Sequence, residues 1–310
     1  MKDRFAVVLT FMLALLCCAE GALAGDVVYG KNSKLKRETL PVPYFNDKPE
    51  AVVTGWDFML EADTTSFWDL EEKIVECVLQ GNMPYQLKRF RKITFTTPVV
   101  DSVEILKKRH KVEIWVLADY LSIGTDDNFV RMPMGPLAAQ RIADSLGCIL
   151  PTTYLVDRIA EASQGHLNYF AFRPLGDRNC RPIVFQDSDN AIKALYKAYG
   201  YRFGDLISGL KKDVVLTYKI HTLSGNEKRV AIYGWHKTNG EPVQPLYVRH
   251  VNYYVDYSHG IRLIYREVYI DGKKYDAKEI LESPQLYRLL SDEPMHLNKA
   301  SYAGFPKWIR

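Results

Sequence analysis

Between residues 66 and 117, apolar residues recur with two different spacings. After Ser66, which has an acidic residue three positions on, they follow at helical spacing as far as Leu79, where a Gly-Asn pair ends the run. This pattern predicts a helix over 66–80. The runs 92–97 and 112–117 instead place β-branched and aromatic residues at alternate positions, which predicts two strands with one buried face each.

The middle of the chain predicts two further helices separated by a glycine. A Gly-Pro pair opens the first, over 136–146, and a Pro-Thr pair opens the second, over 152–159. Helix, glycine turn and helix together resemble a DNA-binding helix-turn-helix, but neither helix carries a dense face of Arg, Asn or Gln. The pair is therefore predicted to be a packed helical hairpin, and no nucleic acid is predicted as a partner.

The C-terminal part is predicted to be rich in strands. A short helix over 190–199 precedes them, and Pro284 begins a closing helix. Loops are predicted over 118–129 and 172–188, where polar side chains, glycine and proline accumulate. The fold class is therefore α+β, with helical hairpins and a β-rich C-terminal half. The five predicted strands, the last ending at an Asp-Gly turn, are 214–220, 229–233, 247–251, 253–257 and 262–270.

The N-terminus has the composition of a secretory signal peptide. A charged start is followed by an apolar run over 5–16 and by a small-residue cleavage site at 22–24. The run is shorter than the roughly 20 residues needed to cross a bilayer, so the mature chain is predicted to be secreted or periplasmic without a transmembrane segment. The predicted organisation is a signal peptide over 1–24, a proline-interrupted extended arm over 25–49, an α+β part over 50–200, and a β-rich part over 201–310 that carries the candidate site.

Cysteine and charge content narrow the class of protein. Export would remove Cys17 and Cys18 with the signal peptide, with lipidation of Cys17 as an alternative. Three cysteines then remain, which allow at most one disulfide: Cys77, Cys148 and Cys180. The net charge of +4 is spread over segments of mixed sign. The basic runs are therefore predicted to be solvated faces rather than a nucleic-acid groove.

Reactive polar side chains crowd onto two segments that otherwise have the pattern of buried strands, 230–236 and 257–262. A strand interior tolerates an imidazole only when something hydrogen-bonds it, so His, Ser, Asp and Arg near strand ends predict a site. The predicted catalytic residues are His236, Asp256, Ser258, His259 and Arg262. The predicted substrate-binding residues are Lys212, Asp213, Trp235 and Tyr257.

Each predicted catalytic residue has a role that follows from its chemistry. His236 or His259 would act as a general base toward water or Ser258. Asp256 would orient an imidazole, and Arg262 would hold a carboxylate or an oxyanion. Side chains alternate along a strand, so Asp256 can reach His259 only if the chain bends near Ser258. The alternative is structural, with Arg262 paired to a surface carboxylate and a backbone carbonyl bonded to each of His236, His250 and His259.

This region resembles the exported L,D-transpeptidases, which cross-link peptidoglycan. That family carries His-Gly near a strand end and Ser-His-Gly-Cys-x-Arg downstream. Here His236 takes the first position, and 258–262, Ser-His-Gly-Ile-Arg, echoes the second, 22 residues on (258 − 236). Ile261 stands where the family has its nucleophilic cysteine, and Lys237 where it has glycine. This local resemblance therefore implies that the Cys-dependent mechanism is absent even if the fold is shared, and Cys148, in an apolar run, is predicted to be an inert core residue.

No metal or other cofactor is predicted. Side chains of the types that bind zinc are present, but no pair has i, i+4 or His-x-His spacing, so zinc stays an alternative. These side chains are His236, His250, Asp256 and His259. A calcium loop is not predicted because the terminal glutamate of that pattern is missing. Its candidate ligands are Asp119, Asp126, Asp127 and Asn128.

Two hypotheses of function follow. The first is an exported hydrolase that acts on a cell-wall polymer such as peptidoglycan. The second is a non-catalytic periplasmic or extracellular protein that binds a glycan or a peptide, because aromatic side chains around the histidines can stack on sugar rings. The runs 117–121 and 254–260 also resemble a family of uncharacterised secreted bacterial proteins, to which no activity is assigned.

Overall fold

Strands from distant parts of the chain meet in one large β-sheet. The computed structural model describes residues 39–41, 45, 49, 51–173, 176–222 and 228–302, all within the unit Leu35–Arg310. The large sheet has the order β1-β2-β3-β13-β6, and β14 pairs with both β3 and β15. A four-stranded sheet has the order β11-β10-β9-β12, and two smaller sheets pair β4 with β5 and β7 with β8. The strands are β1 (Thr39–Pro41), β2 (Arg89–Thr96), β3 (Lys111–Val116), β4 (Ser122–Gly124), β5 (Phe129–Arg131), β6 (Cys148–Ile149), β7 (Gly165–His166), β8 (Ile207–Ser208), β9 (Lys212–Val214), β10 (Ile232–His236), β11 (Pro242–Tyr247), β12 (His259–Gly260), β13 (Ile264–Tyr265), β14 (Glu267–Ile270) and β15 (Lys273–Asp276).

Local signals in the sequence set where the helices begin. Ser66 caps α3 and Thr152 caps α5, each by accepting a backbone N–H with its side-chain oxygen. Pro136 and Pro182 open α4 and α6, at a position where a helix does not use the N–H that proline lacks. The α-helices are α2 (Gly55–Ala62), α3 (Phe67–Leu79), α4 (Pro136–Ser145), α5 (Thr153–Ala162), α6 (Pro182–Tyr199), α7 (Lys219–Thr222) and α8 (Ala277–Glu282). Short 3-10 helices are η1 (Tyr85–Leu87), η2 (Glu104–Leu106), η3 (Gly176–Cys180) and η5 (Tyr287–Leu289).

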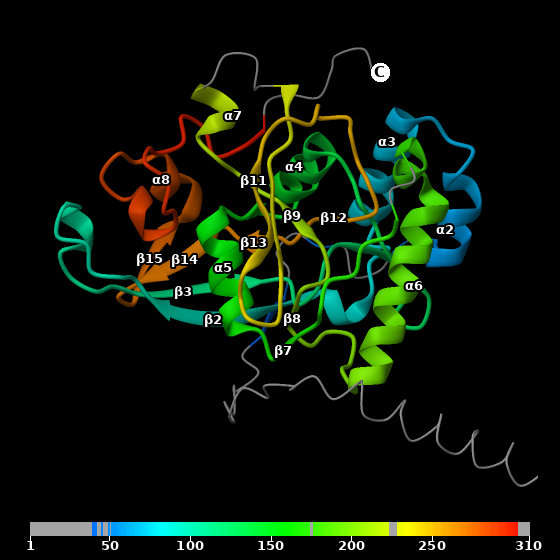
Figure 1. The fold of residues 1–310 in the computed structure, drawn as a ribbon, viewed down its shortest axis with the longest axis horizontal. Helices are drawn as coiled ribbons and strands as arrows, with labels where there is room; N and C mark the ends of the chain where they lie inside the picture. Colours follow the sequence, from blue (N-terminus) through cyan, green and yellow to red (C-terminus); the bar gives the residue numbers. More distant parts are fainter. Residues whose placement is uncertain are drawn as a thin grey trace, which may run out of the picture. The chain divides into compact units, whose positions relative to one another are not determined.

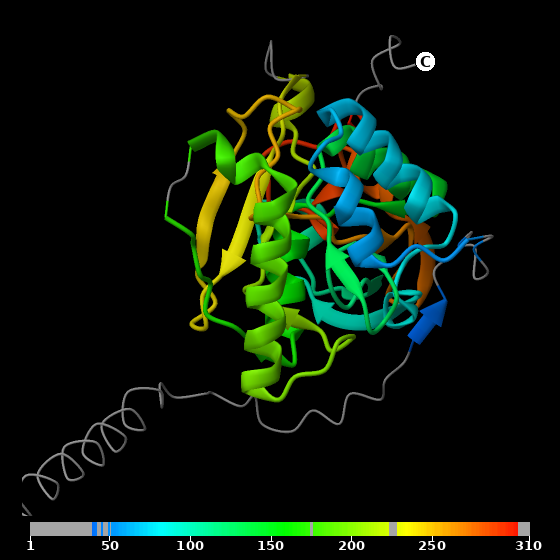
Figure 2. The same ribbon diagram turned by 90° about the vertical axis from the view of Figure 1, so that its right-hand side faces the viewer.

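The helices cover different parts of the sheets. Helix α5 packs on β10 and β2, whereas α4 packs on α3 and β6 (Figure 1). Strand β6 lies between α4 and α5 in the sequence and enters the large sheet, so these helices pack on different elements instead of forming the predicted packed pair. In Figure 2, α6 runs down the front of the view, with the β10–β11 hairpin to its left.

The predicted fold class, α+β with a β-rich C-terminal half, is confirmed. Helix α3 and strands β2 and β3 lie where the hydrophobic pattern predicts them, and Asp271 and Gly272 form the turn of the β14–β15 hairpin with positive φ. Strand β13, from the C-terminal half, pairs with both β3 and β6. The predicted signal peptide and most of the predicted arm lie outside the described residues.

Three strands predicted in the C-terminal half are shortened or replaced by turns, and of the one predicted over 247–251 only Tyr247 lies in a strand, β11. Of the strand predicted over 214–220, only Val214 lies in β9. The N–H groups of Val215 and Leu216 still bond backbone carbonyls, but the N–H of Tyr218 donates to the Glu293 carboxylate at 3.0 Å, and α7 begins at the next residue. The segment predicted over 253–257 turns, since the Asp256 carboxylate accepts the backbone N–H of Ser258 at 2.8 Å. In these last two segments, side chains offer the backbone an alternative to a strand ladder.

Three predicted irregular or terminal segments are also corrected. The loop predicted over 118–129 contains the β4–β5 hairpin, and the loop predicted over 172–188 gives way to α6 at Pro182. The buried face of α6 includes Ser188 and Asp189, so polar residues conceal its helical pattern. The helix predicted from Pro284 is replaced by α8 ahead of it and by η5 after it.

The cysteines and the helices bear on two further predictions. Cys77, Cys148 and Cys180 are free thiols, so the one disulfide that the sequence allowed does not form. Burial raises the pKa of Cys77 to about 12 and raises that of Cys148 as well, which fits an inert core thiol. Over the described ranges, no helix combines the length and the apolar composition needed to cross a bilayer.

Candidate functional site

The predicted site residues divide between the two faces of the four-stranded sheet. Lys212 and Asp213 are neighbours in β9, so their side chains point to opposite faces. Strand β12 runs parallel to β9 with His259 opposite Lys212 and Gly260 opposite Asp213. The prediction that all the catalytic residues converge in one pocket is therefore wrong. Two clusters replace it, one around His259 and one around Asp213.

The His259 cluster consists of Lys212, His250, Tyr254, Asp256, Ser258 and His259. The chain bends as the predicted contact requires, because the His259 N–H donates to the Asp256 carbonyl at 3.1 Å. The Ser258 hydroxyl donates to Asp256 Oδ1 at 2.5 Å, and His259 Nε2 lies 3.9 Å from the same oxygen. The Tyr254 hydroxyl donates to Asp256 Oδ2 at 3.3 Å. The carboxylate therefore binds the serine hydroxyl, and no Ser–His–Asp relay forms.

Burial dominates the electrostatics of this cluster. His259 is 0% exposed, and within the described part of the chain neither ring nitrogen has a hydrogen-bond partner. Burial lowers the pKa of His259 to about 4, which keeps the ring neutral at pH 7. Burial would raise the pKa of Asp256, but His259, which is charged only in the acid range where Asp256 titrates, the Ser258 hydrogen bonds and the Lys212 ammonium lower it overall. A substrate cannot touch His259 in this arrangement, and the predicted bond from a backbone carbonyl to His259 is absent as well.

The Asp213 cluster consists of Tyr120, Lys211, Asp213, His236 and Arg262. These five residues line one cavity of about 10 Å³. A polar cavity of that size has room for about one water molecule. Ser208, Gly209 and Trp235 complete the polar and aromatic part of its wall. This face of the sheet therefore combines ionisable groups with a space that a small reactant can enter.

Asp213 has one oxygen that is bonded and one that is not. The Tyr120 hydroxyl donates to Oδ2 at 2.8 Å, whereas the buried Oδ1 has no partner in the described part of the chain. Burial raises the pKa of Asp213 to about 6, against the lowering effect of Arg262 and of the Tyr120 hydrogen bond. A carboxyl group with a pKa near neutrality can take up and release a proton at physiological pH.

Lys211 and Arg262 supply positive charge around the same cavity. The Lys211 ammonium donates to the Tyr257 carbonyl at 2.5 Å, and burial lowers the pKa of Lys211 to about 8. Arg262 is 2% exposed, and its guanidinium donates to backbone carbonyls of the loop after β3 and of β8: Leu117, Ala118 and Ile207. The predicted pairing of Arg262 with a surface carboxylate is therefore wrong, whereas its predicted role beside a substrate carboxylate or oxyanion stays a prediction.

His236 is held by a carboxylate that the sequence did not associate with it. Its Nε2 lies 2.8 Å from Asp157 Oδ1, and the Tyr233 hydroxyl donates to the same oxygen at 2.9 Å. The preceding residues Gly234 and Trp235 both have positive φ, 99° and 56°, at a register shift between β10 and β11. Positive φ in a tryptophan is a strained conformation of the kind found at functional sites.

The predicted substrate-binding aromatics differ in accessibility. Trp235 makes an edge-to-face contact with Tyr169 at 5.4 Å, and Tyr169 is 40% exposed. The Lys212 ammonium lies 5.2 Å from the centre of the Trp235 ring. Tyr257 is buried, and its hydroxyl accepts the backbone N–H of Phe172 at 2.9 Å. Tyr257 therefore packs the interior, while Tyr169 extends the Trp235 surface to solvent.

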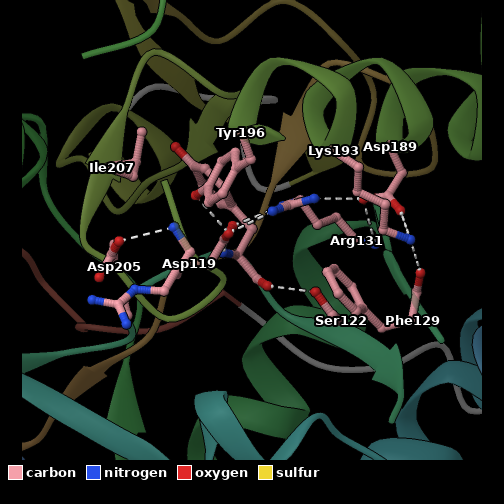
Figure 3. A network of polar contacts seen from close by, with 12 residues as sticks. Asp119, Ser122, Phe129, Arg131, Asp189, Lys193, Tyr196, Asp205 and Ile207 are labelled. Atoms are coloured by element: carbon pink, nitrogen blue, oxygen red, sulfur yellow. Dashed lines mark hydrogen bonds and ion pairs between the residues drawn. The ribbon is translucent and has the colours of Figure 1, made fainter. Parts of the chain in front are cut away.

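A buried ion network holds the chain next to Tyr120 (Figure 3). Arg131 bridges Asp119 and Asp189, with N–O distances of 2.7 and 2.8 Å, and the Tyr196 hydroxyl donates to Asp119 at 2.9 Å. Asp119 directly precedes Tyr120, whose hydroxyl binds Asp213, so the network fixes the chain at that point. The Asp119 carboxylate is paired with Arg131, so Asp119 is not free to act as a calcium ligand.

Gly260 is required by the same contact. A Cβ atom at position 260 would lie 2.4 Å from the ring of Tyr120 and 2.9 Å from the Cβ of Lys211. The glycine of the Ser-His-Gly run therefore makes room for the Tyr120 ring. Ile261, which stands where the transpeptidases have their cysteine, is 0% exposed in the hydrophobic core.

Comparison with known proteins identifies no family for this chain. The chain matches no protein-family model, no curated protein and no solved structure. In the part of the chain that the structure describes, no three His, Cys, Asp or Glu side chains are grouped as metal ligands.

Sequence reasoning missed Tyr120, Lys211 and Ser208, which line the cavity, and His166, which bonds Ser208. His166 Nδ1 lies 2.6 Å from Ser208 Oγ, and Ser208 lines the Asp213 cavity. They are 42 positions apart and meet because β7 and β8 pair in parallel with His166 opposite Ser208. The only local signal is a glycine beside each residue, Gly165 and Gly209.

Proposed function

We propose that the protein is an exported hydrolase that acts on a cell-wall polymer such as peptidoglycan, with its reaction centre in the cavity beside Asp213. The observation that carries this proposal is the Asp213 carboxyl group, which has an unpaired oxygen and lines a cavity with room for one water. Burial raises the pKa of this carboxyl to about 6, which suits a general base at neutral pH.

In the proposed reaction, ionised Asp213 accepts a proton from the water held in the cavity. Lys211 and Arg262 provide positive charge where negative charge develops on the substrate oxygen. His236, whose ring is oriented by Asp157, donates a proton to the leaving group. The three tasks use groups that line one cavity, so the reaction needs no displacement of the sheet.

The size of the cavity supports a polymer as substrate. About 10 Å³ admits a water or a carbonyl oxygen but no sugar ring or side chain, so most of the substrate lies outside. The exposed ring of Tyr169 packs against Trp235, which lines the cavity, and is suited to stacking on a sugar or peptide. Export is part of the proposal and is supported by the signal-peptide pattern of residues 1–24.

The test is fragment release from purified peptidoglycan by the full chain, followed by mass spectrometry of the soluble products. Wild-type protein should release fragments in proportion to time, and Asp213→Asn should lower the rate by about 100-fold or more because the general base is lost. Asp187→Asn, which changes an exposed carboxylate on α6, is the matched control and should retain the wild-type rate. Absence of release by the wild-type protein would remove the proposal for this polymer.

The second candidate is a non-catalytic binding protein for a glycan or peptide, favoured by the exposure of Tyr169 against Trp235. Co-sedimentation with peptidoglycan separates the two functions. A binding protein would sediment with the polymer, release nothing, and lose binding on Tyr169→Ala while Asp213→Asn binds normally. A hydrolase would release fragments that depend on Asp213.

A further inference from the structure

Ser208 and His166 have the geometry of a nucleophile and its base. The two side chains come from adjacent positions of a parallel strand pair, and Ser208 Oγ lies 2.6 Å from His166 Nδ1. Hydrogen bonds from the Leu167 N–H to the Ser208 carbonyl, at 3.0 Å, and from the Gln164 N–H to the Leu206 carbonyl, at 2.8 Å, lock the two strands in this register. A serine becomes nucleophilic when an imidazole at this distance can take its proton.

The position of the pair connects it with the Asp213 cavity. Ser208 lines that cavity, and Gly209 follows with φ +85 as the chain turns toward Lys211. A Cβ at Gly209 would lie 2.0 Å from the Leu167 carbonyl oxygen, so the turn needs glycine. His166 is half-buried, and burial together with the nearby His236 lowers its pKa, which favours the neutral ring that a base requires.

We propose that Ser208 is the nucleophile of the hydrolase and His166 its general base, so that the bond cleaved is an amide or an ester and the reaction passes through an acyl-enzyme. This inference rests on the proposed hydrolase function and specifies its substrate class. A serine hydroxyl attacks acyl groups, whereas glycoside hydrolysis ordinarily uses a pair of carboxylates. In peptidoglycan the target is therefore an amide bond of the peptide part and not the glycan strand.

The steps balance without a further reactant than water. Ser208 Oγ bonds to the carbonyl carbon while its proton passes to His166 Nδ1, and the carbonyl oxygen becomes negative beside Lys211. The bond to the leaving group then breaks, the leaving group takes its proton from His236, and an ester to Ser208 remains. Water held at Asp213 attacks this ester, Asp213 takes one proton of the water, and Ser208 recovers its own proton from His166 as the carboxylic acid departs. The proton on Asp213 returns to His236 through solvent, which restores the starting state.

The experiment is covalent labelling by a fluorophosphonate probe, which reports on an activated serine without any knowledge of the substrate. The full-length wild-type protein should be labelled once, at Ser208, as located by peptide mass spectrometry. Ser208→Ala should abolish labelling, and His166→Ala should slow it by about 100-fold or more. Ser163→Ala is the matched control, because Ser163 is a half-buried serine whose hydroxyl donates to a backbone carbonyl, that of Ile159, at 2.8 Å.

The outcomes separate this inference from the proposed function. Unlabelled wild-type protein, labelling at another residue, or an unchanged rate in folded His166→Ala would each overturn the Ser208–His166 assignment, even if Asp213-dependent hydrolysis is observed. Labelling at Ser208 with no release from peptidoglycan supports the assignment and removes only that polymer as substrate. Melting temperatures of the variants within a few degrees of wild type establish that loss of labelling reflects lost chemistry, and Asp213→Asn should still be labelled.

Discussion

The two faces of the four-stranded sheet carry the same kinds of side chain and use them differently. On one face the Asp256 carboxylate is fully engaged by Ser258 and Tyr254, and the imidazole beside it is sealed from solvent. On the other face Asp213 keeps a free oxygen at a small cavity. The comparison shows that reactive residue types in a motif do not by themselves make a site. An unpaired atom and a space beside it are also needed.

Burial of His259 and of Asp213 predicts opposite responses of the free energy of unfolding to pH, and the larger effect is expected for His259. Burial lowers its folded pKa to about 4, below the ordinary value of 6.5, so the unfolded chain binds a proton first as the pH falls. The stability that the neutral His259 ring contributes is fully present above pH 6.5, and it falls by about 3 kcal/mol as the pH drops to 4. His259→Leu should remove this loss, measured as the difference in free energy of unfolding in urea between pH 7 and pH 4. An unchanged difference would mean that His259 has a partner in solution.

Asp213 should behave in the reverse sense. Burial raises its folded pKa from 3.8 to about 6, so its contribution is present below pH 3.8 and is lost as the pH rises through 6. The loss is up to about 3 kcal/mol, which Asp213→Asn should abolish, making the variant more stable than wild type at pH 7. Urea unfolding at pH 4, 6 and 7 measures it. If Asp213→Asn is less stable than wild type at pH 7, the ionised Asp213 carboxylate has a stabilising partner that the structure does not show.

Replacing His236 and His259, one on each face of the sheet, by glutamine compares the roles of the two histidines in the reaction. His236→Gln should lower kcat/KM for peptidoglycan fragments by about 100-fold, about 3 kcal/mol, because the proton donor is lost. His259→Gln should stay within about twofold of wild type once folding at pH 7 is checked by circular dichroism. The reverse result would return the reaction centre to the His259 cluster.

The smallest effect is expected at Ser258. Removing its hydroxyl eliminates one hydrogen bond to the Asp256 carboxylate, so Ser258→Ala should cost about 2 kcal/mol of unfolding free energy and leave fluorophosphonate labelling unchanged. Urea denaturation and the labelling assay together measure it. Loss of labelling with retained stability would identify Ser258 as the nucleophile instead of Ser208.

Local signals account for the parts of the fold that the sequence predicts. Ser66 caps α3, the alternation in β2 and β3 reflects one buried face, and an Asp-Gly pair turns the β14–β15 hairpin. Each signal lies within a few residues of the structure that it specifies. The confirmed fold class rests on these elements.

The parts that the sequence could not predict depend on distant partners. The 118–129 segment forms a hairpin whose end, Arg131, is paired with Asp189, 58 positions away. Asp157 and His236 are 79 positions apart, and His166 and Ser208 are 42 apart. The motif around Ser258 was visible, but its separation from Asp213 depends on the pairing of β12 with β9. Neither spacing nor composition carries that information.

The absence of a side chain at Gly260 has a consequence for Asp213 on the neighbouring strand β9. An alanine methyl there would push the Tyr120 ring away and break the one direct hydrogen bond that stabilises the Asp213 anion among the described residues. The acid would then weaken further and stay protonated at neutrality. The strength of this acid is thus tuned by the absence of one methyl group on the neighbouring strand.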